Sequence, residues 1–148
     1  MTTHHKSRVS VMHGVNFDAL DRRPAELYGD LSLSRLEQAI SEFARELGLE
    51  SSFFQTNHEG EYVEELHRAN DYADGLLLNP GAWTHYAWAI RDALELGGLP
   101  AVEVHLSDVA QREPFRRVSV ISELCVATIA GRGVDGYRDA LVALKGAW

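Results

Sequence analysis

Glu103 and His105 stand two residues apart in the short apolar segment 101–105. Such a segment predicts a β-strand, and side chains two apart on a strand point to the same face. A carboxylate next to an imidazole fixes the tautomer of the ring and stabilises its protonated form, which suits a general acid. The alternative interpretation of this pair is a half-buried histidine whose ring simply hydrogen-bonds to the carboxylate.

Asn79 and His85 follow a second segment that resembles a buried strand. The leucines at 76–78 are too few for a helix, and Pro80 ends the strand because proline has no N–H for a ladder. We expect Thr84 to cap the helix that follows. Open α/β sheets bind ligands at the carboxyl ends of their strands, so Asn79 and His85 are candidate site residues. Several polar groups at one sheet edge favour a site over isolated core histidines.

A third candidate pair, Arg23 and Tyr28, lies in the irregular segment 14–32. Loops of this length are usually functional or mobile. An arginine close to a tyrosine stabilises the phenolate, and a mobile loop could bring that base to a substrate and exclude water on closing. From the spacing alone, a surface tyrosine that stabilises the loop is the simpler interpretation.

The composition limits the classes of protein and partner. A chain of 148 residues suits one domain with a substantial core. The formal net charge of -8 argues against a nucleic acid or an anionic membrane as the main partner. No apolar run approaches the roughly 20 residues of a membrane helix, and we see no signal peptide. Cys125 is the only cysteine, which suits a cytoplasmic location.

The residue spacing also limits the chemistry. The seven histidines lack the spacing of a metal site, so no metal is expected. The only lysines, Lys6 and Lys145, lie near the termini, where they fit a Schiff-base mechanism poorly. We expect Cys125 to be an inert core thiol, and Trp83 and Trp88 to pack in the core or at a subunit contact.

Predicted strands alternate with predicted helices along the chain. We expect strands at 8–13, 50–55, 76–78, 101–105 and 125–130, and helices at about 33–47, 61–69, 84–96 and 134–145. This alternation predicts a five-stranded parallel sheet in a doubly wound α/β domain over residues 8–148, with the flavodoxin-like strand order 2-1-3-4-5. Residues 1–7 are expected to form a disordered tail.

Several motifs together resemble the type II 3-dehydroquinate dehydratases, without gaps from about Val9 to Leu144. They are 55–61 (QTNHEGE), 79–85 (NPGAWTH), 103–107 (EVHLS), 112–116 (REPFR) and 136–137 (GY). The resemblance implies a flavodoxin-like fold and a dodecamer of four trimers. It also implies reversible loss of water from 3-dehydroquinate to 3-dehydroshikimate through an enolate, without a cofactor or a Schiff base.

The resemblance further implies residue roles. Tyr28 would remove the C2 proton, with Arg23 holding it as phenolate. Asn16 would position a water that stabilises the enolate. His105, oriented by Glu103, would protonate the leaving C1 hydroxyl. The substrate-binding residues would be Asn79, Gly81, Ala82, His85, Leu106, Ser107 and Arg116, with Arg112 in support and Asp92 reaching a neighbouring subunit's site.

Several positions depart from the family's usual pattern around the lid and the pocket. They include His13, Val15, Phe17, Asp18, Tyr86 and Asp108. Such changes leave open the same dehydration on an analogue, such as the amino-substituted dehydroquinate of a secondary-metabolite pathway. A non-catalytic ligand-binding paralogue is a third possibility, and the matching catalytic positions speak against it because a binding module needs no paired acid and base.

Overall fold

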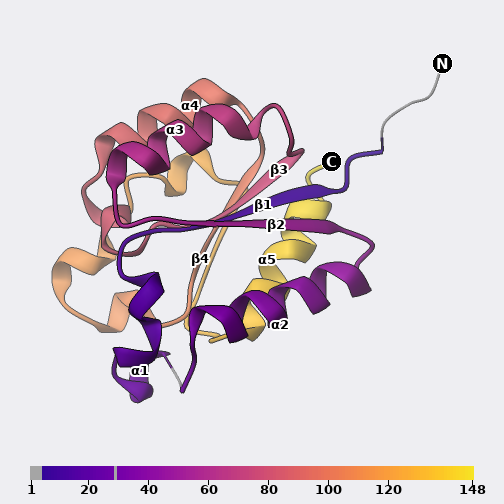
Figure 1. Cartoon of the computed structure of the whole chain (residues 1–148). Helices are drawn as coiled ribbons and strands as arrows, with labels where there is room; N and C mark the ends of the chain where they lie inside the picture. The colour runs from indigo at the N-terminus through magenta and orange to yellow at the C-terminus, as the bar shows by residue number, and fades with distance from the viewer. Residues whose placement is uncertain (1–4, 29) are drawn as a thin grey trace.

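The computed structural model describes residues 5–28 and 30–148, except for the side chain of Tyr28. Five parallel strands form one sheet in the order β2-β1-β3-β4-β5, which confirms the predicted flavodoxin-like topology (Figure 1). The strands are β1 (Arg8–His13), β2 (Glu50–Gln55), β3 (Gly75–Asn79), β4 (Ala101–His105) and β5 (Ala127–Ala130).

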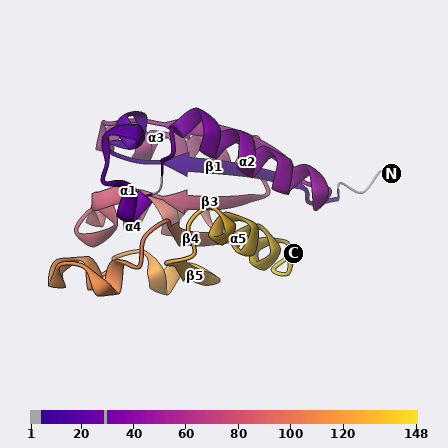
Figure 2. The same cartoon turned by 90° about the horizontal axis from the view of Figure 1, so that it is seen from below.

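Helices cover both faces of this sheet. α3 (Glu59–Ala69) packs beside α4 (Trp88–Gly97) on one face, and α2 (Leu33–Glu46) lies with α5 (Asp135–Lys145) on the other (Figures 1 and 2). The Ser32 hydroxyl caps α2 by accepting the Arg35 N–H at 3.2 Å. In the described part of the chain, none of the helices combines the length and apolar character needed to cross a membrane.

The central strands are buried on both faces, as the run of leucines predicts. Leu77 packs in the apolar cluster under α2 and α5, whereas Leu76 and Leu78 pack in the cluster under α3 and α4. This alternation follows from the two-residue repeat of a strand. The polar residues that follow these strands therefore emerge at one edge of a sheet whose core is fixed on both sides.

The loops after β1 and β3 touch through their backbones at this edge. The Gly14 N–H donates to the Asn79 carbonyl at 2.9 Å. A Cβ atom at Gly14 would lie 2.1 Å from the Pro80 carbonyl oxygen. Gly81 has a φ of 69°, which other residues rarely adopt. Glycine at both positions lets the two loops meet.

The described part of the segment 14–32 contains regular structure. It holds a 3-10 helix, Phe17–Arg22, and a short helix α1 (Ala25–Tyr28). Phe17 and Leu20 are buried in the cluster under α2 and α5. These two apolar side chains anchor the segment to the domain.

The predicted cap at Thr84 is wrong. Residues Gly81–His85 form a 3-10 helix, and α4 begins only at Trp88, with Ala87 at its N-cap. The Thr84 hydroxyl is instead buried without a hydrogen-bond partner, while the Thr84 carbonyl accepts the Val120 N–H. Packing against a distant loop therefore outweighs the local capping preference.

β5 begins two residues later than predicted because the Cys125 N–H closes a 3-10 turn onto the Ser122 carbonyl. Burial raises the pKa of the Cys125 thiol to about 12, which agrees with an inert thiol.

The expected disorder of residues 1–7 stays a prediction, because residues 1–4 lie outside the described residues. The Ser7 N–H donates to the Asp74 carboxylate at 3.1 Å.

Candidate active site

A pocket of about 250 Å³ opens at the carboxyl edge of the sheet. Most of the predicted site residues line it: Asn16, Arg23, Asn79, Gly81, Ala82, His85, His105, Leu106, Ser107, Arg112 and Arg116. The apolar side chains of Phe17, Leu20 and Val109, which were not predicted, complete the lining. The three-residue spacing of Phe17 and Leu20 is a sequence signal that could have revealed them.

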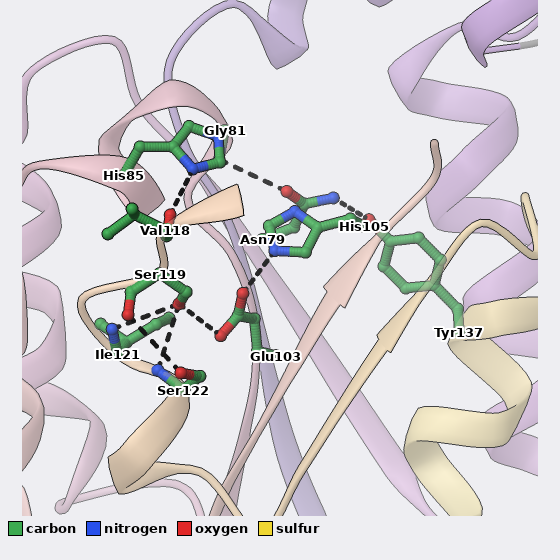
Figure 3. A network of polar contacts seen from close by, with 10 residues as sticks. All are labelled: Asn79, Gly81, His85, Glu103, His105, Val118, Ser119, Ile121, Ser122 and Tyr137. Atoms are coloured by element: carbon green, nitrogen blue, oxygen red, sulfur yellow. Dashed lines mark hydrogen bonds and ion pairs between the residues drawn. The ribbon is translucent and has the colours of Figure 1, made fainter. Parts of the chain in front are cut away.

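Glu103 and His105 lie side by side at the end of β4, as their spacing predicts. Glu103 Oε2 is 2.6 Å from His105 Nε2, and both side chains are buried. His105 lines the pocket, and Glu103 lies behind it (Figure 3). A buried carboxylate is costly unless donors surround it, so the partners of Glu103 decide what the pair can do.

Ser119 supplies the second donor, and sequence reasoning missed it. Its hydroxyl donates to Glu103 Oε1 at 2.8 Å and accepts the backbone N–H groups of Ile121 and Ser122 at 3.3 and 3.1 Å (Figure 3). Because these N–H groups occupy the acceptor side, the single hydroxyl proton points to Glu103. These two contacts, one to each carboxylate oxygen, hold Glu103 beside the His105 ring.

Asn79 is held by a separate set of contacts. Its Oδ1 accepts the Gly81 N–H at 3.3 Å, and its Nδ2 donates to the Tyr137 hydroxyl at 2.9 Å. The same hydroxyl lies 2.8 Å from His13 Nε2. All three side chains in this chain of contacts are buried, so the Asn79 amide has one fixed orientation at the pocket wall.

His85 presents an acceptor to the pocket. Its Nδ1 donates to the Val118 carbonyl at 2.7 Å, and its ring packs edge-to-face on Phe115. Burial lowers the pKa of His85, partly opposed by the Val118 carbonyl. A neutral ring with a proton on Nδ1 leaves Nε2 as an acceptor for a hydroxyl group.

The pocket is cationic although the whole chain is acidic. Arg23, Arg112 and Arg116 line it, and no carboxylate side chain of the described residues does. Arg112 donates to the Ser107 hydroxyl at 3.3 Å, whereas Arg116 pairs with Glu113 and stacks on Phe115. Such a surface attracts a small anion, with Arg side chains suited to a carboxylate. Within residues 5–28 and 30–148, no cluster of three or more histidine, cysteine or acidic side chains is arranged for a metal ion.

The loop that carries Asn16 is tied to β2. Asn16 has a φ of 72°, and its N–H donates to Asn57 Oδ1 at 2.8 Å. Asn57 also donates to Asp18 Oδ2 at 3.0 Å. Asn57 belongs to the motif 55–61, so that motif shapes the first loop of the pocket.

Among the other predicted site residues, Asp92 is not brought into the pocket of this chain. Asp92 is exposed on α4 and does not line the pocket. Tyr28 ends α1, but its side chain lies outside the described part of the structure. Among the departures from the family pattern, Phe17 lines the pocket, whereas the lining does not include His13, Val15, Asp18, Tyr86 or Asp108.

Comparison with known proteins agrees with this fold. A sequence model of the family described as Dehydroquinase class II matches residues 7–145. A 3-dehydroquinate dehydratase of Carboxydothermus hydrogenoformans is 47% identical over 137 residues, covering 93% of this chain and 89% of that protein. The crystal structure of type II dehydroquinase from Butyrivibrio crossotus has a TM-score of 0.89 and 36% identity, covering 94% of this chain and 97% of its own. The enzyme from Propionibacterium acnes has a TM-score of 0.88 and 39% identity, covering 97% and 99%.

The chain therefore belongs to the class II dehydroquinase family. Membership of this family makes it a hydro-lyase. The family resemblance that the motifs indicate is thereby confirmed over nearly the whole domain.

Proposed function

We propose that this enzyme reversibly dehydrates 3-dehydroquinate to 3-dehydroshikimate by anti-elimination through an enolate. The observation that carries the proposal is the buried Glu103–His105 pair, with His105 facing a pocket lined by arginines. A base removes a proton from C2, and the electrons move onto the C3 carbonyl oxygen. The enolate then reforms the carbonyl, a C1–C2 double bond forms, and the C1 hydroxyl leaves as water after taking a proton.

Tyr28 and Arg23 are the base and its partner in this proposal. The lining of the pocket by Arg23 supports it, because a guanidinium favours the phenolate form of a tyrosine. Tyr28 follows in α1, five residues along the chain. Asn16, also in the lining, would hold the water that stabilises the enolate oxygen.

His105 is the proposed acid. Its contact with Glu103 supports this role, because the carboxylate stabilises an imidazolium until the proton is delivered. With Nε2 on Glu103, the other ring nitrogen, Nδ1, is the atom that would give the proton to the C1 hydroxyl. Ser119 keeps Glu103 in place through Oε1.

The remaining lining residues would bind the substrate. Asn79, His85 and Arg116 would contact ring hydroxyls over the floor formed by Gly81 and Ala82. The backbone of Leu106 and Ser107 would bind the carboxylate, with Arg112 holding the Ser107 side chain. The Leu106 carbonyl accepts the Gly133 N–H, and a planar trans peptide therefore turns the Ser107 N–H away from that loop.

We also propose that the enzyme works as trimers assembled into a dodecamer in the cytoplasm. The exposed apolar side chains of Tyr86, Trp88 and Leu96 in and just before α4 support a subunit contact, since they are exposed by 59%, 63% and 78%. Asp92 lies on the same helix, from which it would reach a neighbouring site. Sedimentation equilibrium should give twelve copies, and a monomer with full activity would contradict the role of Asp92.

The test of function follows the ultraviolet absorbance of the conjugated enone product. Mixing the protein with 3-dehydroquinate should give this absorbance, and no signal at high enzyme concentration would contradict the proposal. A signal only with the amino-substituted dehydroquinate would favour the secondary-metabolite alternative. Borohydride added with substrate should not inactivate the enzyme, because the pocket lining contains no lysine among the described residues.

A further inference from the structure

A chain of three buried side chains runs behind the pocket wall. His13 ends β1, Tyr137 lies in α5, and Asn79 ends β3. The Tyr137 hydroxyl is 2.8 Å from His13 Nε2 and 2.9 Å from Asn79 Nδ2. Only Asn79 lines the pocket, so the other two act through it if they act on a ligand at all.

The hydrogen-bond chain has only one arrangement of protons. The Gly81 N–H needs an acceptor, which fixes Oδ1 of Asn79 on that side and Nδ2 on the side of Tyr137. The Tyr137 oxygen therefore accepts from Asn79. Its single proton must go to His13 Nε2, so His13 is neutral and carries its proton on Nδ1.

The surroundings agree with this arrangement. Burial lowers the pKa of His13 to about 3, so the ring stays neutral near pH 7. Burial also raises the pKa of Tyr137, so its hydroxyl keeps its proton. The His13 ring lies 4.7 Å from the Phe17 ring, which lines the pocket.

We propose that His13 and Tyr137 are positioning residues that hold the Asn79 amide so that its second N–H donates to a substrate oxygen in the pocket. The inference rests on the proposed function, in which Asn79 binds the ring of 3-dehydroquinate. Without Tyr137 the amide loses its partner on one side and can rotate about its last side-chain bond. The pocket then presents a donor for only part of the time, which weakens substrate binding more than the chemical step.

A double-mutant cycle tests this coupling. Tyr137→Phe should raise KM for 3-dehydroquinate roughly tenfold with little change in kcat, as expected for one lost buried hydrogen bond. In an Asn79→Ala background the same substitution should change KM very little, because the group it positions is gone. The same rise in KM in both backgrounds would overturn the proposal.

Tyr62→Phe is the matched control for losing a buried tyrosine hydroxyl. The Tyr62 hydroxyl donates to the Met12 carbonyl at 3.0 Å and lies in the cluster under α3 and α4, away from the pocket. This variant should lower the melting temperature to a similar extent and leave KM unchanged. At His13, Gln keeps an acceptor for Tyr137 and should retain a low KM, whereas Leu offers none and should match Tyr137→Phe.

The histidine tautomer gives a test that needs no activity. Magic-angle-spinning NMR of sedimented protein with ¹⁵N-labelled histidine should show a neutral ring, protonated at Nδ1, whose signals vanish in His13→Gln while those of the Nδ1-protonated His85 remain. A proton on Nε2 of that ring, or a charged ring at pH 7, would overturn the proposal. If the wild type does not turn over 3-dehydroquinate, the proposed function fails, and the NMR result still decides whether the hydrogen-bond chain exists.

Discussion

Two buried histidines lie at the same edge of the sheet with different partners. His105 contacts the carboxylate of Glu103, which Ser119 also contacts. His13 contacts the hydroxyl of Tyr137, which also contacts Asn79. A carboxylate stabilises a charged imidazole, whereas a phenol in an apolar core does not, and burial lowers the pKa of His13 to about 3. Both histidines are buried, and they differ in their partners, a carboxylate for His105 and a phenol for His13.

The two histidine clusters therefore have different proposed roles in the site. The cluster of Ser119, Glu103 and His105 would move a proton, so its loss should lower kcat. The cluster of His13, Tyr137 and Asn79 would hold one donor still, so its loss should raise KM. Substitutions in each cluster test whether these two roles are separate, and the largest effect is expected at His105.

Removal of the proposed acid should have the largest effect. His105→Ala should lower kcat by roughly 10²- to 10⁴-fold, the usual contribution of a general acid. Steady-state kinetics on 3-dehydroquinate would measure it, with circular dichroism to verify the fold. Turnover near that of the wild type would refute the assignment of His105 and remove the contrast with His13.

The second prediction concerns stability against pH. The pKa of His13 is about 3 in the folded protein and 6.5 for the ordinary side chain. Below pH 6.5 the unfolded chain therefore binds a proton that the folded chain does not, and stability falls as the pH falls from 6.5 toward 3. This effect should lower the free energy of unfolding by roughly 2 kcal/mol between pH 7 and pH 5, as measured by chemical denaturation.

His13→Gln should remove that part of the pH dependence. His67→Gln, at an exposed position on α3, is the matched control and should retain it. An equal loss of stability in His13→Gln and in the wild type would mean that His13 is not the group responsible, and the neutral cluster would lose its support.

The smallest effect is expected at Ser119. Ser119→Ala leaves Glu103 with His105 as its remaining donor, so kcat should fall roughly tenfold with KM nearly unchanged. Ser122→Ala is the control, because the backbone N–H of Ser122, and not its side chain, donates to the Ser119 hydroxyl. A rise in KM with normal kcat in Ser119→Ala would contradict the separate roles proposed for the two clusters.

Periodicity explains which of these features the sequence predicts. The alternation of residues 8–13 predicts β1, and the short apolar segment 101–105 predicts β4, where the period of two places Glu103 and His105 on one face. The parallel sheet then brings the predicted polar residues to one edge, where most of them line a single pocket.

Contacts between distant segments explain the rest. Ser119 is 16 residues from Glu103 and lies in a loop without a period, so no spacing relates the two. The inward orientation of Tyr137 follows from the pattern of α5, but its partners His13 and Asn79 come from other elements. Thr84 fails as a cap because its segment packs against a loop that only the folded chain brings near.

The central claim is that an acid and a base act in separate steps through an enolate. Proton NMR tests it most directly, by following the exchange of a C2 proton of 3-dehydroquinate in D₂O. In His105→Ala the signal of one of the two C2 protons should disappear faster than in a protein-free sample while no enone forms, because the base still works and the leaving group is not protonated. Tyr28→Phe should show neither exchange nor product. Loss of both exchange and elimination in His105→Ala, or rapid exchange in Tyr28→Phe, would contradict the account.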